Sequence, residues 1–139
     1  MNEKEYQKLA KENQKLLELF KHWLNAQNLS NKTIHNHLFN AEFFINKYLL
    51  DYQFVAPIEG ISLIEDFMED FFVRKCMWSN VSSIKSTAAS LKKFYQCLAE
   101  NGKMSDKDLN SVKEIIKDNM DFWIENVTDY NNFDEDEWF

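Results

Sequence analysis

The sequence predicts an all-α protein, built as a small orthogonal bundle of four to five helices. Two glycines and one proline among 139 residues leave few positions for the tight turns that β-hairpins need. Hydrophobic residues make up 45% of the chain and aromatic residues 15%, which suits a packed core and excludes a disordered chain. We therefore expect one helical domain over residues 1–127, followed by an acidic, aromatic tail over residues 128–139.

The clearest helical signal lies in residues 82–103. Its apolar side chains recur three and four positions apart, while the intervening positions carry lysines and glutamine. Asn101 and Gly102 follow, and Gly102 can adopt the positive φ that ends many helices. The apolar face is predicted to consist of Ile84, Ala88, Leu91, Tyr95 and Leu98, with Phe94 and Ala99 beside them.

Two helices and a loop are expected at the start of the chain. The first helix spans residues 3–27, where Leu, Phe and Trp recur at helical spacing among charged residues. Ser30 is a good N-cap for a second helix that reaches residue 50. Residues 51–60 contain the only proline and one of the two glycines, so we expect the main loop there.

The remaining helices are predicted from their starts. Ser62 with Glu65 three positions later forms a capping-box signature for a third helix that ends at about residue 77. Ser105 precedes a last helix over residues 106–127, whose first turn contains two aspartates favoured by the helix dipole. Beyond it, residues 128–139 are predicted to be extended.

These elements resemble a known domain. A helix that begins with small hydroxyl residues, packs Leu-x-x-Phe-Tyr-x-x-Leu inward and ends at Asn-Gly is similar to the last long helix of the SAM-like core-binding domain of tyrosine recombinases, the phage integrase family. The Ser/Thr-rich turn, the Thr-hydrophobic pair and the later Phe of that domain's second helix are matched by Ser30, Thr33, Ile34 and Phe44. The resemblance covers about residues 16–104.

The resemblance implies no enzyme activity here. Recombinases carry catalysis in a second domain, which supplies two arginines, a lysine, histidines and a tyrosine nucleophile. This chain ends before such a domain and contains one arginine, Arg74. His35 and His37 lie two positions apart and point in different directions on a helix, and His22 has no acidic or cysteine neighbour at ligand spacing. We therefore expect no metal site and no cofactor.

The resemblance also implies a DNA-binding surface and a role in DNA integration or recombination. In the family, the starts of the second and fourth helices grip duplex DNA. Lysine and hydroxyl side chains contact phosphates and give affinity that does not depend on base sequence. The matching positions are Lys32, Thr33 and His35 on the second helix, and Lys85, Ser86 and Lys92 on the helix over residues 82–103.

The charge distribution leaves a second function open. Residues 1–103 hold 13 Lys and Arg against 12 Asp and Glu, a net of +1, whereas residues 104–139 hold 3 against 11, a net of −8. A near-neutral body lacks the basic stripe of a free-standing DNA binder. The chain would then be a protein-interaction or oligomerisation module. Its tail would either solubilise the protein, bind a partner through Phe133, Trp138 and Phe139, or cover the basic face as a DNA mimic.

The two cysteines and the chain start indicate a cytoplasmic protein without a membrane partner. Cys76 and Cys97 lie among apolar neighbours and are expected to be buried free thiols, with a disulfide only if the helices bring them close. No signal peptide is visible, and no apolar stretch approaches the ~20 residues that span a membrane.

Overall fold

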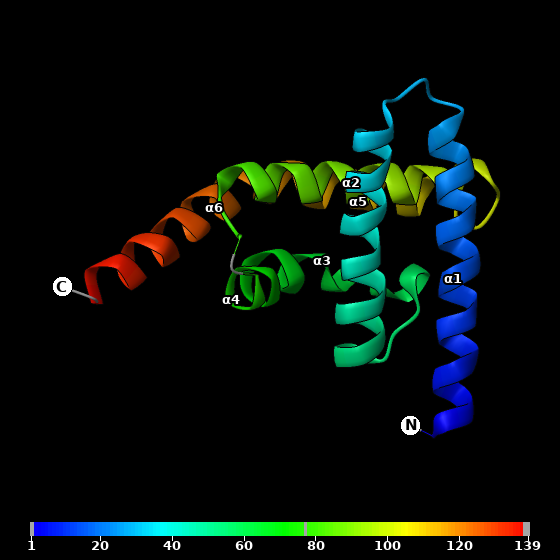
Figure 1. Ribbon diagram of the computed structural model, residues 1–139, viewed down its shortest axis with the longest axis horizontal. Coiled ribbons are helices and arrows are strands. Elements are labelled where there is room, and N and C mark those ends of the chain that lie inside the picture. The colour runs from blue at the N-terminus through cyan, green and yellow to red at the C-terminus, as the bar shows by residue number, and fades with distance from the viewer. Residues whose placement is uncertain (1, 77, 138–139) are drawn as a thin grey trace.

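The chain forms an all-α orthogonal bundle, which confirms the expected fold class. The computed structural model describes residues 2–76 and 78–137, with side chains up to residue 132, and no strand occurs in these ranges. Helices α1 (Glu3–Asn25) and α2 (Asn31–Glu42) form one antiparallel pair. Helices α5 (Val81–Glu100) and α6 (Asp106–Glu137) form a second pair that lies across the first (Figure 1).

Several helix ends were predictable from single residues. Ser30 caps α2, where its hydroxyl oxygen accepts the N–H of Thr33 at 3.2 Å, and Ser105 caps α6 through the N–H of Asp108 at 3.1 Å. Gly102 ends α5 with a φ of +70°. The N-cap of α5 lies two residues before the predicted stretch, because the side chain of Asn80 accepts the N–H of Ser83.

The predicted loop over residues 51–60 is confirmed only for residues 54–56, and the rest of the range is helical. Helix α2 continues directly into a π-helical segment, η1 (Phe43–Gln53), and a 3₁₀-helix, η2 (Pro57–Leu63), follows after three residues. Two tertiary contacts hold η2 against the core. Tyr95 donates a hydrogen bond to the carbonyl of Pro57 at 2.6 Å, and Gly60 lies so close to Leu49 that a Cβ there would be 2.6 Å from a Leu49 methyl carbon.

The third helix is continuous but its predicted cap is wrong. It consists of α3 (Ile64–Asp66), a π-helical segment η3 (Phe67–Phe71) and α4 (Phe72–Lys75). Ser62 is exposed inside η2, and no side chain caps the start of α3. Because η2 leads directly into α3, the first N–H groups of α3 follow a turn that is already helical, and a side-chain cap is not required.

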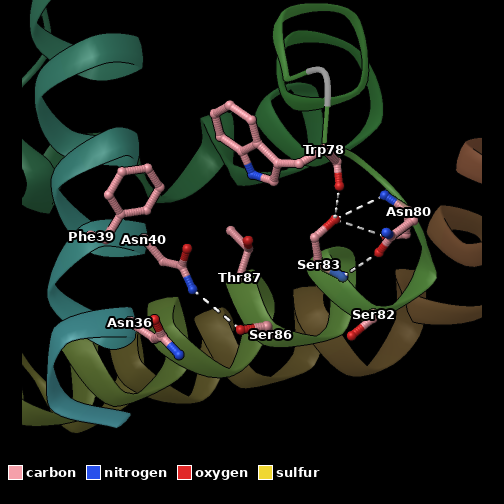
Figure 2. A pocket seen from close by; sticks show the side chains of 9 residues that line it. All are labelled: Asn36, Phe39, Asn40, Trp78, Asn80, Ser82, Ser83, Ser86 and Thr87. Atoms are coloured by element: carbon pink, nitrogen blue, oxygen red, sulfur yellow. Dashed lines mark hydrogen bonds between the residues drawn. The ribbon is translucent and has the colours of Figure 1, made fainter. Parts of the chain in front are cut away.

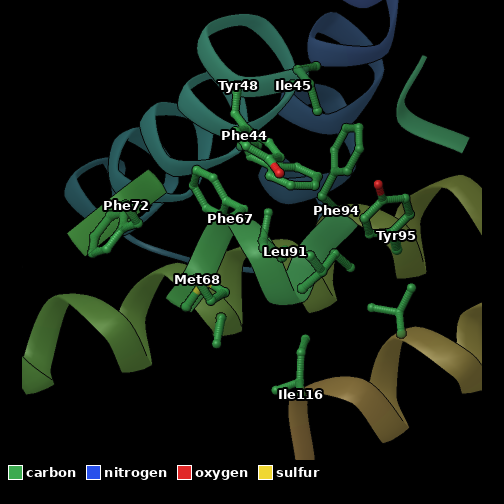
Figure 3. Packing of buried hydrophobic residues seen from close by; sticks show 14 of the residues in the cluster. Phe44, Ile45, Tyr48, Phe67, Met68, Phe72, Leu91, Phe94, Tyr95 and Ile116 are labelled. Carbon is green, nitrogen blue, oxygen red and sulfur yellow. The ribbon is translucent and has the colours of Figure 1, made fainter. Parts of the chain in front are cut away.

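The core is unusually aromatic. Tyr48 packs on Phe67 with ring centroids 5.2 Å apart, and Phe44 meets Phe67 edge to face at 4.9 Å (Figure 3). The five residues predicted as the apolar face of the helix over residues 82–103 are all buried, which confirms that prediction. They belong to the same buried cluster as Ile116 and Trp123 of α6, and Figure 3 shows Ile116 below the α5 side chains.

The predicted extended conformation of residues 128–139 is wrong through residue 137, because α6 continues to Glu137. Val127 is fully buried and the Asn131 side chain donates to the Ser79 carbonyl at 3.1 Å, so tertiary contacts support the helix beyond its predicted end. The last turns extend away from the bundle (Figure 1). Phe133 lies in this helix without a described side chain, and Trp138 and Phe139 lie outside the described residues.

Both cysteines are buried free thiols, as predicted. Burial raises the pKa of Cys76 to about 12 and that of Cys97 to about 11, so both stay protonated at neutral pH. In the ranges that the structure describes, no helix combines the length and the apolar composition that a membrane crossing requires.

Candidate functional site

Helix α2 crosses α5 through a buried polar network, which links the two helices that the sequence singles out. The fully buried hydroxyl of Ser90 lies 2.8 Å from Nδ1 of His37 and accepts a hydrogen bond from the Asn40 side chain at 3.0 Å. Ser90 donates to the Ser86 carbonyl at 3.0 Å. We assign the Ser90 proton to this bond, so that Ser90 accepts from Nδ1–H of His37.

The pKa of His37 is lowered by the groups around it. Partial burial lowers its pKa below the ordinary value of 6.5, and the nearby positive charge of Lys93 lowers it further. The imidazole is therefore neutral at pH 7. The effect of Lys93 on His37 shows that a lysine of α5 lies beside the helix crossing.

The three α2 residues predicted to contact DNA occupy its first turn. Lys32 and His35 are exposed, whereas Thr33 is half-buried and bound to Ser30 through both its N–H and its hydroxyl. Thr33 is thus part of the helix cap. By helical spacing, Lys32 lies one turn before Asn36 on the same flank of α2.

The α5 residues predicted to contact DNA are divided between two hollows. Lys85 and Lys92 line a groove of about 350 Å³ between α5 and α6, which we call the lysine groove. Ser86 lies on the other side, 3.3 Å from the Asn40 amide. The lysine groove is lined by Lys85, Ala88, Ala89, Lys92, Lys93, Gln96, Ile116 and Met120.

The surface around the crossing is positive although the whole chain carries a net charge of −7. Residues 31–41 of α2 and 81–99 of α5 together contain four lysines and no carboxylate. The one ion pair within the described side chains joins Arg74 to Asp70 at 2.7 Å, so none of these four lysines is neutralised by a carboxylate. Exposed amines without an acidic partner attract anions.

The second hollow, about 320 Å³, lies where α2 meets the start of α5, and we call it the notch (Figure 2). Its lining combines two exposed aromatic rings with amide and hydroxyl groups and contains no charged residue. Of the predicted site residues only Ser86 belongs to it. The others were missed, although an Asn pair four positions apart beside an exposed Phe was a visible signal. The lining residues are Asn36, Phe39, Asn40, Trp78, Asn80, Ser82, Ser83, Ser86 and Thr87.

The structure thus brings α2 and α5 together as the sequence predicted, but the two helices cross instead of starting side by side. The start of α5 faces the second turn of α2 across the notch, and Lys85, Lys92 and Lys93 line the separate groove between α5 and α6. No cluster of three metal-ligating side chains occurs within the described part of the chain. No protein-family model, no curated protein and no solved structure matches this chain.

Proposed function

We propose that this chain is a non-catalytic DNA-binding domain that contacts the phosphates of duplex DNA through α2 and α5, like the recombinase core-binding domain that it resembles. The single observation that carries the proposal is the charge of the helix crossing. Residues 31–41 of α2 and 81–99 of α5 carry four lysines without a carboxylate, and Glu42 and Glu100 are the last residues of the two helices, in a chain that is acidic overall. Selective placement of lysines on one surface is the electrostatic footprint of a nucleic-acid binder.

The use of lysines instead of arginines suggests DNA binding without sequence preference. Specific reading of guanine in the major groove most often uses the two parallel hydrogen bonds of an arginine. The one arginine, Arg74, binds both carboxylate oxygens of Asp70, at 2.7 and 3.0 Å, and lies on α4. Lysines contribute phosphate contacts, which position a duplex but do not identify its bases. We expect weak affinity, because the acidic end of α6 repels DNA.

The proposed role is therefore to modulate a DNA recombination or integration complex through weak, sequence-independent contacts. Binding is measured by fluorescence anisotropy with a labelled duplex at low salt. Replacing the three lysines of α5 (Lys85→Gln, Lys92→Gln and Lys93→Gln together) should weaken binding by roughly ten-fold or more.

The matched control removes the same number of positive charges from another helix. Lys4, Lys8 and Lys11 are exposed on α1, so the combined substitution Lys4→Gln, Lys8→Gln and Lys11→Gln also removes three charges. We expect this control to lose much less affinity. Equal losses in the two triple variants would show that only total charge matters, and the proposed surface would be wrong.

A protein-interaction function is the second candidate, and α6 favours it. Phe122 and Tyr130 are 53% and 37% exposed on this helix, outside both hollows. Exposed aromatic side chains are common at protein interfaces. A DNA affinity that does not change between low and physiological salt would favour this second role. Removal of residues 133–139 tests the acidic end separately. Higher DNA affinity after removal would indicate that the acidic end opposes DNA binding, and unchanged affinity would exclude the DNA-mimic interpretation.

A further inference from the structure

We propose that the notch binds one unpaired nucleobase, so that the domain prefers DNA containing a bulged or single-stranded base over intact duplex. This inference rests on the proposed function, since the lysines beside the notch supply the phosphate contacts. It adds a second chemistry to that function: recognition of a planar ring by aromatic and neutral polar groups.

Two aromatic rings form the rim of the notch. Phe39 comes from α2 and Trp78 from the linker before α5, and each side chain is 48% exposed. Their ring centroids lie 6.1 Å apart with a tilt of 58°, and Figure 2 shows both rings beside the same hollow. Large aromatic side chains that are half exposed in a concave site offer ring faces on which a base can stack.

The floor of the notch contains a hydroxyl group that a ligand can reach. Thr87 is only 2% exposed, and its side chain is directed into the notch between the two aromatic residues (Figure 2). Within the described residues its hydroxyl makes no hydrogen bond, although Ser90 on the next turn bonds to the carbonyl four positions before it. Its oxygen is not sealed from solvent, because the one enclosed side-chain atom without a partner among the described residues is Oδ1 of Asn13, so a base in the notch can reach this hydroxyl.

Further donors and acceptors surround this hydroxyl. The Asn40 amide nitrogen is bound to Ser86 and Ser90, which leaves its oxygen available as an acceptor. Asn36 and Ser82 are exposed and line the opposite walls. Amides and hydroxyls match the mixed donors and acceptors on the edge of a nucleobase, and the absence of charge in the lining matches the neutrality of that base.

The surroundings favour a base that is attached to a backbone. Lys32 lies one turn before Asn36 on the side of α2 that lines the notch, and Lys85, next to Ser86 in sequence, lines the adjacent lysine groove, so both helices provide an amine close to the notch. A base inside a duplex is stacked and paired and cannot enter a hollow on a protein surface without leaving the helix. The notch therefore requires a base that is already unpaired.

The test compares three labelled DNAs of equal length: an intact duplex, the same duplex with one bulged nucleotide, and the same bulge with an abasic residue. Stacking and hydrogen bonding of one base should tighten binding of the bulged duplex by roughly ten-fold. The abasic bulge should bind like the intact duplex. Equal affinity for the bulged and abasic DNAs would overturn the inference.

Substitutions assign the preference to the notch. Trp78→Ala and Phe39→Ala should each abolish most of the preference for the bulge and leave affinity for intact duplex unchanged. Phe122→Ala, which removes a similarly exposed ring from α6, should keep the preference. If Trp78→Ala and Phe122→Ala behave alike, the notch is not the site of base recognition.

The design separates failure of this inference from failure of the proposed function. Lysine-dependent binding of intact duplex without a bulge preference would overturn the notch alone. If no DNA binds, the proposed function fails, and the notch is tested by following the Trp78 indole signal in NMR spectra with deoxyadenosine monophosphate. A saturable shift with the nucleotide and none with maltose supports the inference, whereas a shift with maltose alone, or none with either, overturns it.

Discussion

The two interfaces of α5 differ in chemistry. Toward α6, α5 presents an apolar face whose residues, among them Leu91, are buried against Ile116 and Val112. Toward α2, it presents serines and a threonine, and the contact is made by hydrogen bonds from His37 and Asn40. One helix therefore contributes a conventional core on one side and a polar crossing on the other.

This difference indicates which interface of α5 stabilises the fold and which one is available for function. Burial of an apolar interface stabilises the fold in proportion to the buried area, and its close packing tolerates few substitutions. A polar interface contributes little net stability, because its hydrogen bonds replace those with water. The notch lies beside the polar crossing, and the α5 lysines line the solvent-exposed lysine groove. Neither surface is part of the buried core.

The largest expected effect comes from the apolar side. Leu91 is fully buried, and Leu91→Ala should lower the free energy of unfolding by about 3 kcal/mol through lost burial and the cavity left behind. Urea denaturation measures this change. Lys92→Ala, at the next, exposed position, should change stability very little. A loss of less than about 1 kcal/mol for Leu91→Ala would contradict the packing described.

The polar crossing should be less sensitive. Ser90→Ala removes the acceptor for His37 and Asn40, which leaves polar groups without a partner and should cost about 1–2 kcal/mol. The same substitution at exposed Ser82 provides the control in a urea titration. If Ser90→Ala costs as much as Leu91→Ala, the contrast between the two interfaces is wrong.

The turn that joins the two helices of the apolar interface should show a smaller effect. Gly102 has a φ of +70°, where a side chain is strained, so Gly102→Ala should cost about 1 kcal/mol. Gly102→Asn should cost less, because asparagine adopts this conformation more readily. Thermal unfolding of the two variants measures the difference, and a more stable alanine variant would refute the strain.

The smallest effect is a dependence on pH. The pKa of His37 is lower in the folded state, so the unfolded state binds more protons below pH 6.5. The contribution of His37 to stability is thus full above pH 6.5 and declines as the pH falls through the range between the two pKa values. Urea midpoints measured from pH 7.5 to 5 should show this decline in the wild type and less of it in His37→Gln. Parallel pH profiles would exclude His37 as its source.

The apolar half of the fold could be predicted because it follows helical periodicity. The buried face of α5 and the caps at Ser30 and Ser105 each depend on residues close in sequence. The course of η2 and the length of α6 depend on distant contacts, such as Tyr95 with Pro57 and Asn131 with Ser79. No local pattern contains that information, so the Ser62 cap, the extended tail and most of the predicted loop were wrong.

The candidate site was predicted only in part for the same reason. Lys85 and Lys92 were identified, and the structure places them together in the lysine groove. The notch joins α2 to the linker at Trp78 and the start of α5, which follow α2 about 40 residues later in the sequence. Only the folded chain shows that these segments form one hollow. Ser86 was assigned to a phosphate contact, whereas the structure places it in the wall of the notch.

The salt dependence of duplex DNA binding by the intact chain tests the central claim most directly. If the four lysines of α2 and α5 each neutralise one phosphate, a plot of the logarithm of the association constant against the logarithm of salt concentration should have a slope of roughly −3 to −4. Removing the three α5 lysines should reduce its magnitude to about 1. A flat plot for the intact chain would contradict the account.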